Sequence, residues 1–165
     1  MSHFLRTAVA AIALATSSGA LAAANSIPQD LPTVDAHQAI KDVQSKANLS
    51  IKFKDDDEDI WEVAGRRGDC EDIVLWKRQQ LIQLGFDASD LEVLILIKPK
   101  SKRAGGVREG HVVLRVKSAD MVMDNVEKFP MNYAEYMKRY EYKLICEAVD
   151  FRPSMRVQDR CRPRA

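Results

Sequence analysis

Gly68-Asp69-Cys70-Glu71-Asp72 runs directly into Ile73-Val74-Leu75-Trp76-Lys77-Arg78-Gln79-Gln80-Leu81-Ile82-Gln83-Leu84-Gly85. Apolar residues recur in this second run with the 3.6-residue period of a helix, on a face made by Ile73, Val74, Leu81 and Leu84. Gly85 is a natural helix end, so the pattern places Cys70 at or near a helix N-terminus. There, backbone N–H groups and the helix dipole favour a thiolate, the form of cysteine that attacks carbonyl groups. Cys70 is therefore a candidate nucleophile, although a free cysteine is more commonly a small buried hydrophobic residue.

The first 24 residues have the features of a signal peptide. Arg6 supplies a positive charge, residues 8–15 are apolar, and two small-x-small cleavage sites lie within residues 20–24. The sequence predicts a cleaved signal peptide over residues 1–24, with an uncleaved membrane anchor as the alternative. A single domain over residues 25–165 would follow, periplasmic or secreted and without a membrane span in the mature chain.

The charge balance excludes a general attraction to nucleic acid. The whole chain has a formal net charge of +1, and removal of the signal peptide with Arg6 brings it to zero. One acidic block, Asp55-Asp56-Asp57-Glu58-Asp59, has carboxylates that suit calcium. It does not match the calcium loop of an EF-hand, because Ile60 takes the glycine position and Arg66 the terminal acidic position. A solvated acidic loop is the better interpretation.

Three cysteines are present, Cys70, Cys146 and Cys161. In an oxidising compartment two of three are expected to pair. Cys146 and Cys161 are close in sequence and outside the region around Cys70, so we expect a disulfide between them. Such a bond contributes on the order of 3 kcal/mol and leaves Cys70 as the free thiol.

Further elements are expected on both sides of the cysteine segment. Thr33 or Asp35 is a candidate cap for a helix that runs to about Lys46 and is broken by Asn48. The inner face of this helix is expected to contain Ala36, Ala39, Ile40 and Val43. Residues 133–142 are expected to form an aromatic-rich helical or strand-like segment, and residues 142–149 a strand that closes the sheet.

A hairpin is predicted to bring a histidine and an aspartate together. Leu91–Lys98 predicts a strand buried on both faces, and His111–Val116 predicts the next strand. If Lys117–Asp120 is a turn of four residues, or if the turn has two residues, His111 and Asp124 lie on the same face within hydrogen-bond reach. A turn of three or five residues separates them, in which case they are an ordinary strand-end histidine and a turn-forming acid.

His111 is the better candidate for a general base. The mature chain has one other histidine, His37, on the predicted N-terminal helix. Gly110 permits close approach to His111, and Asp124 is placed to fix its tautomer, as a cysteine–histidine system requires. The chain order of cysteine on a helix, histidine on a strand and aspartate on the next strand predicts an α+β fold with a papain-like or transglutaminase-like core. In it, Cys70 lies at a helix N-terminus packed on an antiparallel sheet that carries the other two residues.

Four motifs make the sequence similar to the bacterial transglutaminase-like cysteine proteinases, periplasmic enzymes of the LapG type. They are Gly68-Asp69-Cys70-Glu71-Asp72, Lys77-Arg78-Gln79-Gln80-Leu81 with Leu84-Gly85, Gly110-His111-Val112-Val113-Leu114 and Val122-Met123-Asp124-Asn125. The resemblance covers roughly residues 36–142 and implies a thiol protease with Cys70, His111 and Asp124 as its triad. The chain departs from the family in its acidic block, in its C-terminal cysteines and in Ile73, where relatives often have tyrosine.

The resemblance also implies a calcium ion held by Asp69 and Glu71. A cation there would offset the repulsion between these carboxylates and a thiolate at Cys70. Alternatively, Asp69 caps the helix and Glu71 complements its dipole. Relatives cut a large surface adhesin and are inhibited by an inner-membrane receptor for cyclic di-GMP, which connects the family to biofilms.

The predicted function is therefore that of a periplasmic cysteine endopeptidase acting on a protein substrate, with calcium as its cofactor. The backbone N–H of Cys70 is one expected oxyanion donor, and the indole of Trp61 is either a second donor or a core residue. A transglutaminase or amidase would use the same thiol with a different acceptor. A calcium-dependent binding module without turnover is the third reading.

Overall fold

The computed structural model describes residues 35–55, 60–97, 110–152 and 160–161. The chain divides into two compact units, Met1–Pro32 and Thr33–Ala165, and every described residue belongs to the second. The predicted signal peptide over residues 1–24 and most of the acidic block therefore lie outside the described residues. Within the described ranges, no helix is long and apolar enough to cross a membrane.

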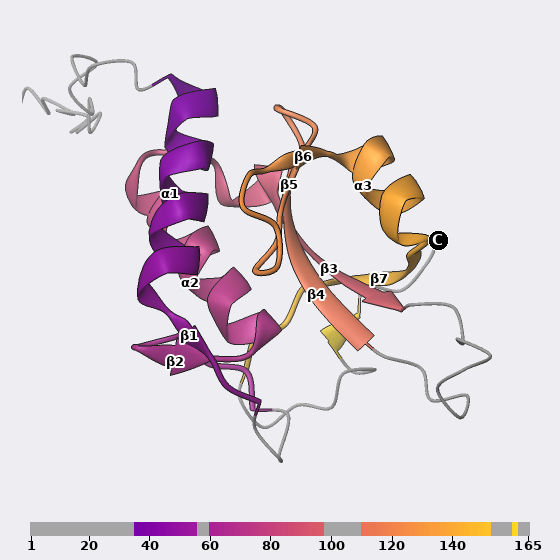
Figure 1. Cartoon of the computed structure of the whole chain (residues 1–165), viewed down its shortest axis with the longest axis horizontal. Helices are drawn as coiled ribbons and strands as arrows, with labels where there is room; N and C mark the ends of the chain where they lie inside the picture. Colours follow the sequence, from indigo (N-terminus) through magenta and orange to yellow (C-terminus); the bar gives the residue numbers. More distant parts are fainter. Residues whose placement is uncertain (1–34, 56–59, 98–109, 153–159, 162–165) are drawn as a thin grey trace, which may run out of the picture. The chain divides into compact units, whose positions relative to one another are not determined.

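A five-stranded antiparallel sheet forms the centre of the fold, with strand order β6-β5-β4-β3-β7 (Figure 1). The strands are β3 (Leu91–Ile97), β4 (Gly110–Val116), β5 (Met121–Met123), β6 (Met131–Asn132) and β7 (Lys143–Ala148). Val116 pairs with Met121, so residues 117–120 form the predicted four-residue turn. The strand predicted to close the sheet is also confirmed, because β7 pairs with β3 at one edge.

Helices cover both faces of this sheet (Figure 1). On one face lie α2 (Cys70–Gln83) and, beside it, α1 (Ala36–Ser50); on the other lies α3 (Tyr133–Tyr140). Alternate strand residues point to the two sides. The α1/α2 side includes Val93, Ile95, Val112 and Leu114, and the α3 side includes Leu94, Leu96, Val113 and Val122. This confirms the α+β class and a central strand buried on both faces.

Two predicted boundaries are wrong. The N-terminal helix is capped by Asp35 as predicted, but it continues through Asn48 to Ser50. The Asn48 side chain does not compete with the helix backbone, because its amide donates to the carbonyls of Asp124 and Glu127 instead. The strand expected to include Asp124 ends at Met123.

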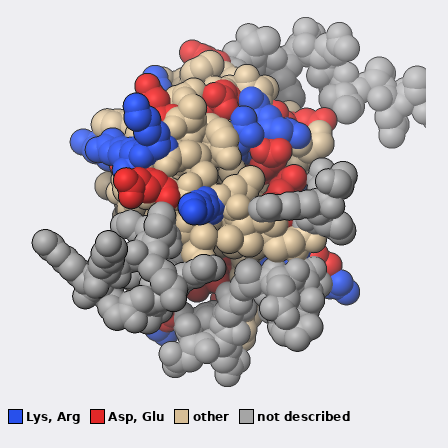
Figure 2. Space-filling model, turned by 90° about the vertical axis from the view of Figure 1, so that its right-hand side faces the viewer, with Lys and Arg blue, Asp and Glu red and all other residues tan. Residues whose placement is uncertain are grey.

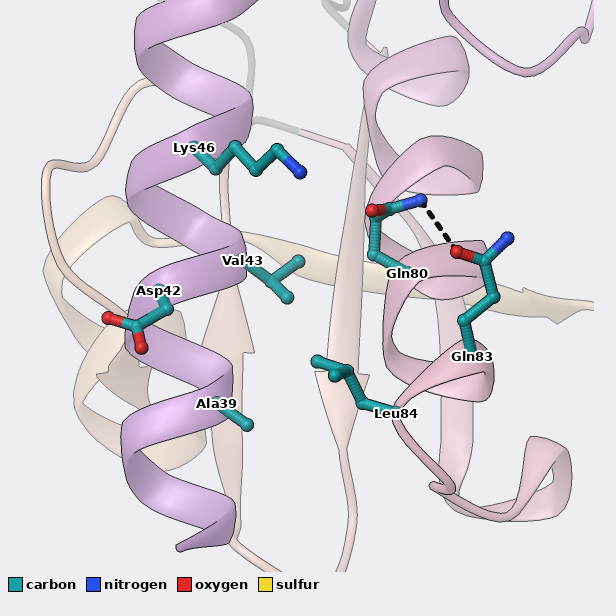
Figure 3. Close-up of a pocket in the computed structure, with 7 residues that line it drawn as sticks. All are labelled: Ala39, Asp42, Val43, Lys46, Gln80, Gln83 and Leu84. Carbon is teal, nitrogen blue, oxygen red and sulfur yellow. Dashed lines mark hydrogen bonds between the residues drawn. The ribbon is translucent and has the colours of Figure 1, made fainter. Parts of the chain in front are cut away.

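Some side chains on the predicted inner faces also differ. Ala39, Ile40 and Val43 are buried as expected, whereas Ala36 is exposed. Leu84 is 47 % exposed, because the helix has already ended at Gln83. Leu84 instead lines an open groove of about 290 Å³ between α1 and α2, where Val43 and Ala39 form the opposite wall and Gln80 donates to Gln83 (Figure 3).

A short parallel pair and a disulfide complete the described structure. The strands β1 (Lys52–Phe53) and β2 (Arg67–Gly68) pair in parallel just before α2, and a 3-10 helix, Ala88–Asp90, precedes β3. Cys146 and Cys161 are joined by a disulfide, as the sequence predicted, and Cys70 is the free cysteine. The disulfide holds residues 160–161 beside the end of β7.

The surface carries both signs of charge. On the face shown in Figure 2, acidic and basic side chains are interspersed, with uncharged surface between them. This distribution is consistent with the near-zero net charge of the chain.

Candidate active site

Cys70 occupies the first residue of α2, where the sequence placed it. Asp69 is the N-cap residue, and its carboxylate accepts from the backbone N–H of Asp72 at 3.4 Å. Gly68 is required just before the cap, because a Cβ there would lie 2.7 Å from Cβ of Asp72. The cap and this close approach fix the start of the helix and thus the position of the thiol.

The thiol itself is held in its protonated form. Its Sγ donates to Oε2 of Glu71 at 3.0 Å. Burial raises the pKa of Cys70 well above the ordinary value, and the negative charge and hydrogen bond of Glu71 raise it further, against a smaller lowering by a backbone hydrogen bond from Val112. The sequence indicated both effects, a helix N-terminus that favours a thiolate and flanking carboxylates that oppose it. Glu71 and burial outweigh the dipole.

His111 and Asp124 form a hydrogen bond across the hairpin, with Nε2 of His111 2.8 Å from Oδ1 of Asp124. β4 and β5 are paired from Val116–Met121 to Leu114–Met123. This register puts His111 and Asp124 on one face, as predicted for a turn of four residues. The histidine ring also stacks on Tyr142, with ring centroids 5.7 Å apart. Both interactions orient the imidazole. With Nε2 facing the carboxylate, Nδ1 is the ring nitrogen left for proton exchange.

Asp124 is fully buried and is held by donors on both carboxylate oxygens. Oδ1 also accepts from the backbone N–H of Val126 at 3.2 Å, and Oδ2 accepts from the hydroxyl of Tyr136 at 2.6 Å. Burial alone would raise the pKa of Asp124, but His111 together with these donors holds it below its ordinary value. The carboxylate is therefore ionised although it is buried.

A cavity of about 170 Å³ brings the nucleophile candidate and the histidine together. Its lining includes Cys70 and Glu71 from α2, His111 from β4, and the indole of Trp61. No hydrogen bond joins Cys70 to His111 in the described part of the chain. Such contacts are often long before substrate binds. Trp61 is both a wall of this cavity and a core residue, since it is 1 % exposed.

The two predicted metal ligands lie at the start of α2, but they are engaged within the protein. Asp69 caps the helix, and Glu71 accepts from the thiol, which is the arrangement expected without a metal. The described residues contain no group of three or more His, Cys, Asp or Glu side chains placed to bind one ion. Two buried carboxylates nonetheless match the hard oxygen ligands that calcium prefers, and backbone carbonyls and water commonly supply the rest. The donor chemistry fits calcium as a partial ligand set.

The sequence motifs did not reveal the residues that support Asp124. Tyr136 was part of an aromatic-rich segment of undecided structure, and Gln44 was not singled out. The only signal for Gln44 was its place four residues before Asn48, which puts the two on one helix face.

Fold and site together define a papain-like thiol hydrolase arrangement, with a helix-borne cysteine facing a strand-borne histidine. The sequence profile described as bacterial transglutaminase-like cysteine proteinase matches residues 20–154. The chain belongs to this family of cysteine peptidases.

Solved structures of LapG from Legionella pneumophila have the same fold. The calcium-bound form is 18 % identical, with a TM-score of 0.53 over 67 % of this chain and 63 % of that one. A second LapG structure gives 18 % and 0.54 over the same shares, and the EGTA-treated form gives 18 % and 0.53 over 67 % and 61 %. The match thus spans less than two thirds of the length of these relatives. No curated protein matches the chain.

Proposed function

We propose that the chain is a cysteine endopeptidase in which Cys70 is the nucleophile, His111 the general base and Asp124 the residue that orients it. One observation carries this assignment. Nε2 of His111 lies 2.8 Å from the buried carboxylate of Asp124, and the same histidine lines a cavity together with Cys70. Membership of a cysteine proteinase family supports the same chemistry.

The reaction follows from the roles of these atoms. Nδ1 of His111 takes the proton of the Cys70 thiol as sulfur attacks the substrate carbonyl, and the imidazolium is stabilised by Asp124. The proton then passes to the leaving amine, and water cleaves the thioester with His111 as base. The backbone N–H of Cys70 and the indole of Trp61 are the proposed oxyanion donors.

Calcium is proposed as the cofactor, with Asp69 and Glu71 among its ligands. A bound cation would neutralise the carboxylates next to the thiol, which favours the thiolate. Without such a cation Cys70 stays protonated, because its thiol donates a hydrogen bond to the Glu71 carboxylate. The proposal is also supported by the existence of calcium-bound and EGTA-treated forms of Legionella LapG, which has the same fold.

Localisation and partners are inferred from the family and the leader sequence. A signal peptide over residues 1–24 would deliver the chain to the periplasm, where a disulfide such as Cys146–Cys161 is stable. The substrate is proposed to be a protein. A large surface adhesin as that substrate, a role in biofilms and an inner-membrane cyclic di-GMP receptor as regulator stay predictions from the family resemblance.

Alkylation of Cys70 by iodoacetamide tests the assignment. The other two cysteines are in a disulfide, so the purified chain has one reactive thiol. At pH 7 and with calcium, we expect Cys70 to react much faster than a thiol with the ordinary pKa of about 8.5. The reaction should slow in His111→Ala and with EGTA, but not in the control His37→Ala, since His37 lies exposed on α1.

The opposite result has a clear meaning. If Cys70 in the calcium-loaded chain reacts no faster than an ordinary thiol, and His111→Ala changes nothing, the peptidase assignment is wrong. The chain would then be a binding module on this fold. If Cys70 is activated, mass spectrometry of a cleaved protein substrate separates hydrolysis from acyl transfer to an amine.

A further inference from the structure

The carboxylate that meets His111 lies on irregular backbone. The last residue of β5 paired with β4 is Met123, and Asp124 follows beyond the end of the ladder. Sheet hydrogen bonds therefore do not fix the Asp124 backbone. Some other set of contacts must fix it, because a small displacement would change the 2.8 Å bond to His111.

Side chains from α1 make these contacts. Nε2 of Gln44 donates to the carbonyl oxygens of Asp124 and Glu127, both at 2.6 Å. One helical turn later, Nδ2 of Asn48 donates to the same two oxygens, at 3.3 and 2.7 Å. Two amide groups of a helix thus hold the segment that carries the active-site carboxylate.

A buried lysine determines which way the Gln44 amide points. Nζ of Lys77, on α2, donates to Oε1 of Gln44 at 2.9 Å, and both side chains are fully buried. An ammonium group has donors and no acceptor, so only the amide oxygen can form a hydrogen bond with it. The NH₂ end is then directed at the carbonyls of Asp124 and Glu127. A flipped amide would place oxygen against oxygen at 2.6 Å.

A fully buried lysine is energetically costly in this place. Its Nζ has one hydrogen-bond partner among the described residues, the neutral Gln44 amide, and no carboxylate contacts it directly. Burial lowers the pKa of Lys77 to about 7, although the negative charge of Asp124 opposes this. An apolar side chain of the same length would avoid the penalty of burying the ammonium.

We infer that Lys77 and Gln44 form a buried positioning pair that sets the backbone of Asp124, and thereby the geometry with which its carboxylate orients His111. Neither residue touches the cavity lined by Cys70, so both act through Asp124. The inference rests on the proposed function, in which Asp124 orients the general base.

The test compares Lys77→Met and Gln44→Met with two matched controls in the full chain with calcium. Lys46→Met removes an exposed lysine from α1, and Gln38→Met removes an exposed glutamine whose amide donates to Asp42. In the two positioning variants we expect alkylation of Cys70 by iodoacetamide to slow by roughly five- to tenfold, the effect of one lost hydrogen bond. The controls should react at the wild-type rate.

A spectroscopic readout separates positioning from general structural damage. Nitrogen-15 NMR of the His111 ring reports its tautomer and the proton shared with Asp124, whether or not Cys70 is reactive. We expect the Nε2-bound proton of His111 to shift upfield in Lys77→Met and Gln44→Met. An unchanged ring signal together with an unchanged alkylation rate would overturn the inference. If Cys70 of the wild-type protein reacts like an ordinary thiol, the proposed function is wrong. The His111 ring signal would still decide whether Lys77 and Gln44 position Asp124.

The double variant Lys77→Met/Gln44→Met keeps the test decisive if a single variant fails to fold. It removes both side chains together, so neither the ammonium nor the amide stays buried without its partner. If the two residues act as one pair, alkylation of Cys70 in the double variant is no slower than in the slower single variant. If a single variant does not fold, the double variant should be five- to tenfold slower than wild type. Additive losses, or a wild-type rate and ring signal in the double variant, would contradict a shared role.

Discussion

Tyr136 donates its hydroxyl hydrogen to Oδ2 of Asp124 at 2.6 Å, while Oδ1 of the same carboxylate lies 2.8 Å from Nε2 of His111. Different side chains therefore bind the two carboxylate oxygens. Burial, and then the charge of Asp124, raise the pKa of Tyr136, so the phenol stays protonated and remains a donor. The bond links α3 to the active site.

Replacing Tyr136 by Phe should weaken both the fold and the site. The buried Asp124 carboxylate loses one of its donors, which costs about 1.5–3 kcal/mol in free energy of unfolding and slows alkylation of Cys70. Urea denaturation and the iodoacetamide rate measure the two effects. Tyr140→Phe is the control, because its hydroxyl donates to Glu127 and not to Asp124. Equal losses in the two variants would mean that the Asp124 bond has no special role.

The sequence predicted the parts of this site that follow from local periodicity. The helix start at Cys70 and the four-residue turn that aligns His111 with Asp124 both depend on neighbouring residues, and both are confirmed. The contacts of Asp124 with Gln44 join residues 80 positions apart, and no local pattern encodes them. For the thiol, the sequence indicated the repulsion by neighbouring carboxylates but not the larger effect of burial or the hydrogen bond to Glu71, which depend on tertiary packing.

Lys77 predicts a specific dependence of stability on pH. Burial lowers its pKa in the folded chain to about 7, against about 10.4 in the unfolded chain. Below pH 7 both states bind the proton, so the destabilising effect of Lys77 is complete and constant. As pH rises from 7 towards 10 the unfolded state binds more protons, and this penalty is progressively relieved.

The difference in free energy of unfolding between wild type and Lys77→Met should thus shift in favour of wild type across this range. The slope approaches about 1.4 kcal/mol per pH unit. Urea denaturation of both chains between pH 6 and 9 gives the difference. Lys46→Met, which removes an exposed lysine, should show no such slope. A flat difference for Lys77→Met would mean that Lys77 keeps its proton throughout.

Gly68 and Gly65 offer a matched pair of substitutions before the active-site helix. A Cβ at Gly68 would lie 2.7 Å from Cβ of Asp72 and 3.1 Å from Cβ of Ala64, whereas a Cβ at Gly65 meets nothing within 4 Å. Gly68→Ala should lower the free energy of unfolding by about 1–3 kcal/mol through overpacking. It should also disturb the bond from the backbone N–H of Glu62 to Asp72. Gly65→Ala should be close to neutral in the same denaturation experiment, and a loss as large as that of Gly68→Ala would show that contact with Asp72 is not the cause.

Calcium should stabilise the chain through Asp69 and Glu71. Any ligand that binds only the folded state raises its stability, by about 2.7 kcal/mol at one hundred times the dissociation constant. Thermal unfolding with calcium and with EGTA should therefore give a higher midpoint with calcium for the wild type. Asp69→Asn and Glu71→Gln each remove a negative ligand and should abolish most of this difference.

Glu62→Gln is the control, since it removes an exposed carboxylate from the loop before the helix and should keep the full calcium response. A response that survives in Asp69→Asn and Glu71→Gln but is lost in Glu62→Gln would move the ion away from the thiol, and with it the proposed neutralisation of Glu71.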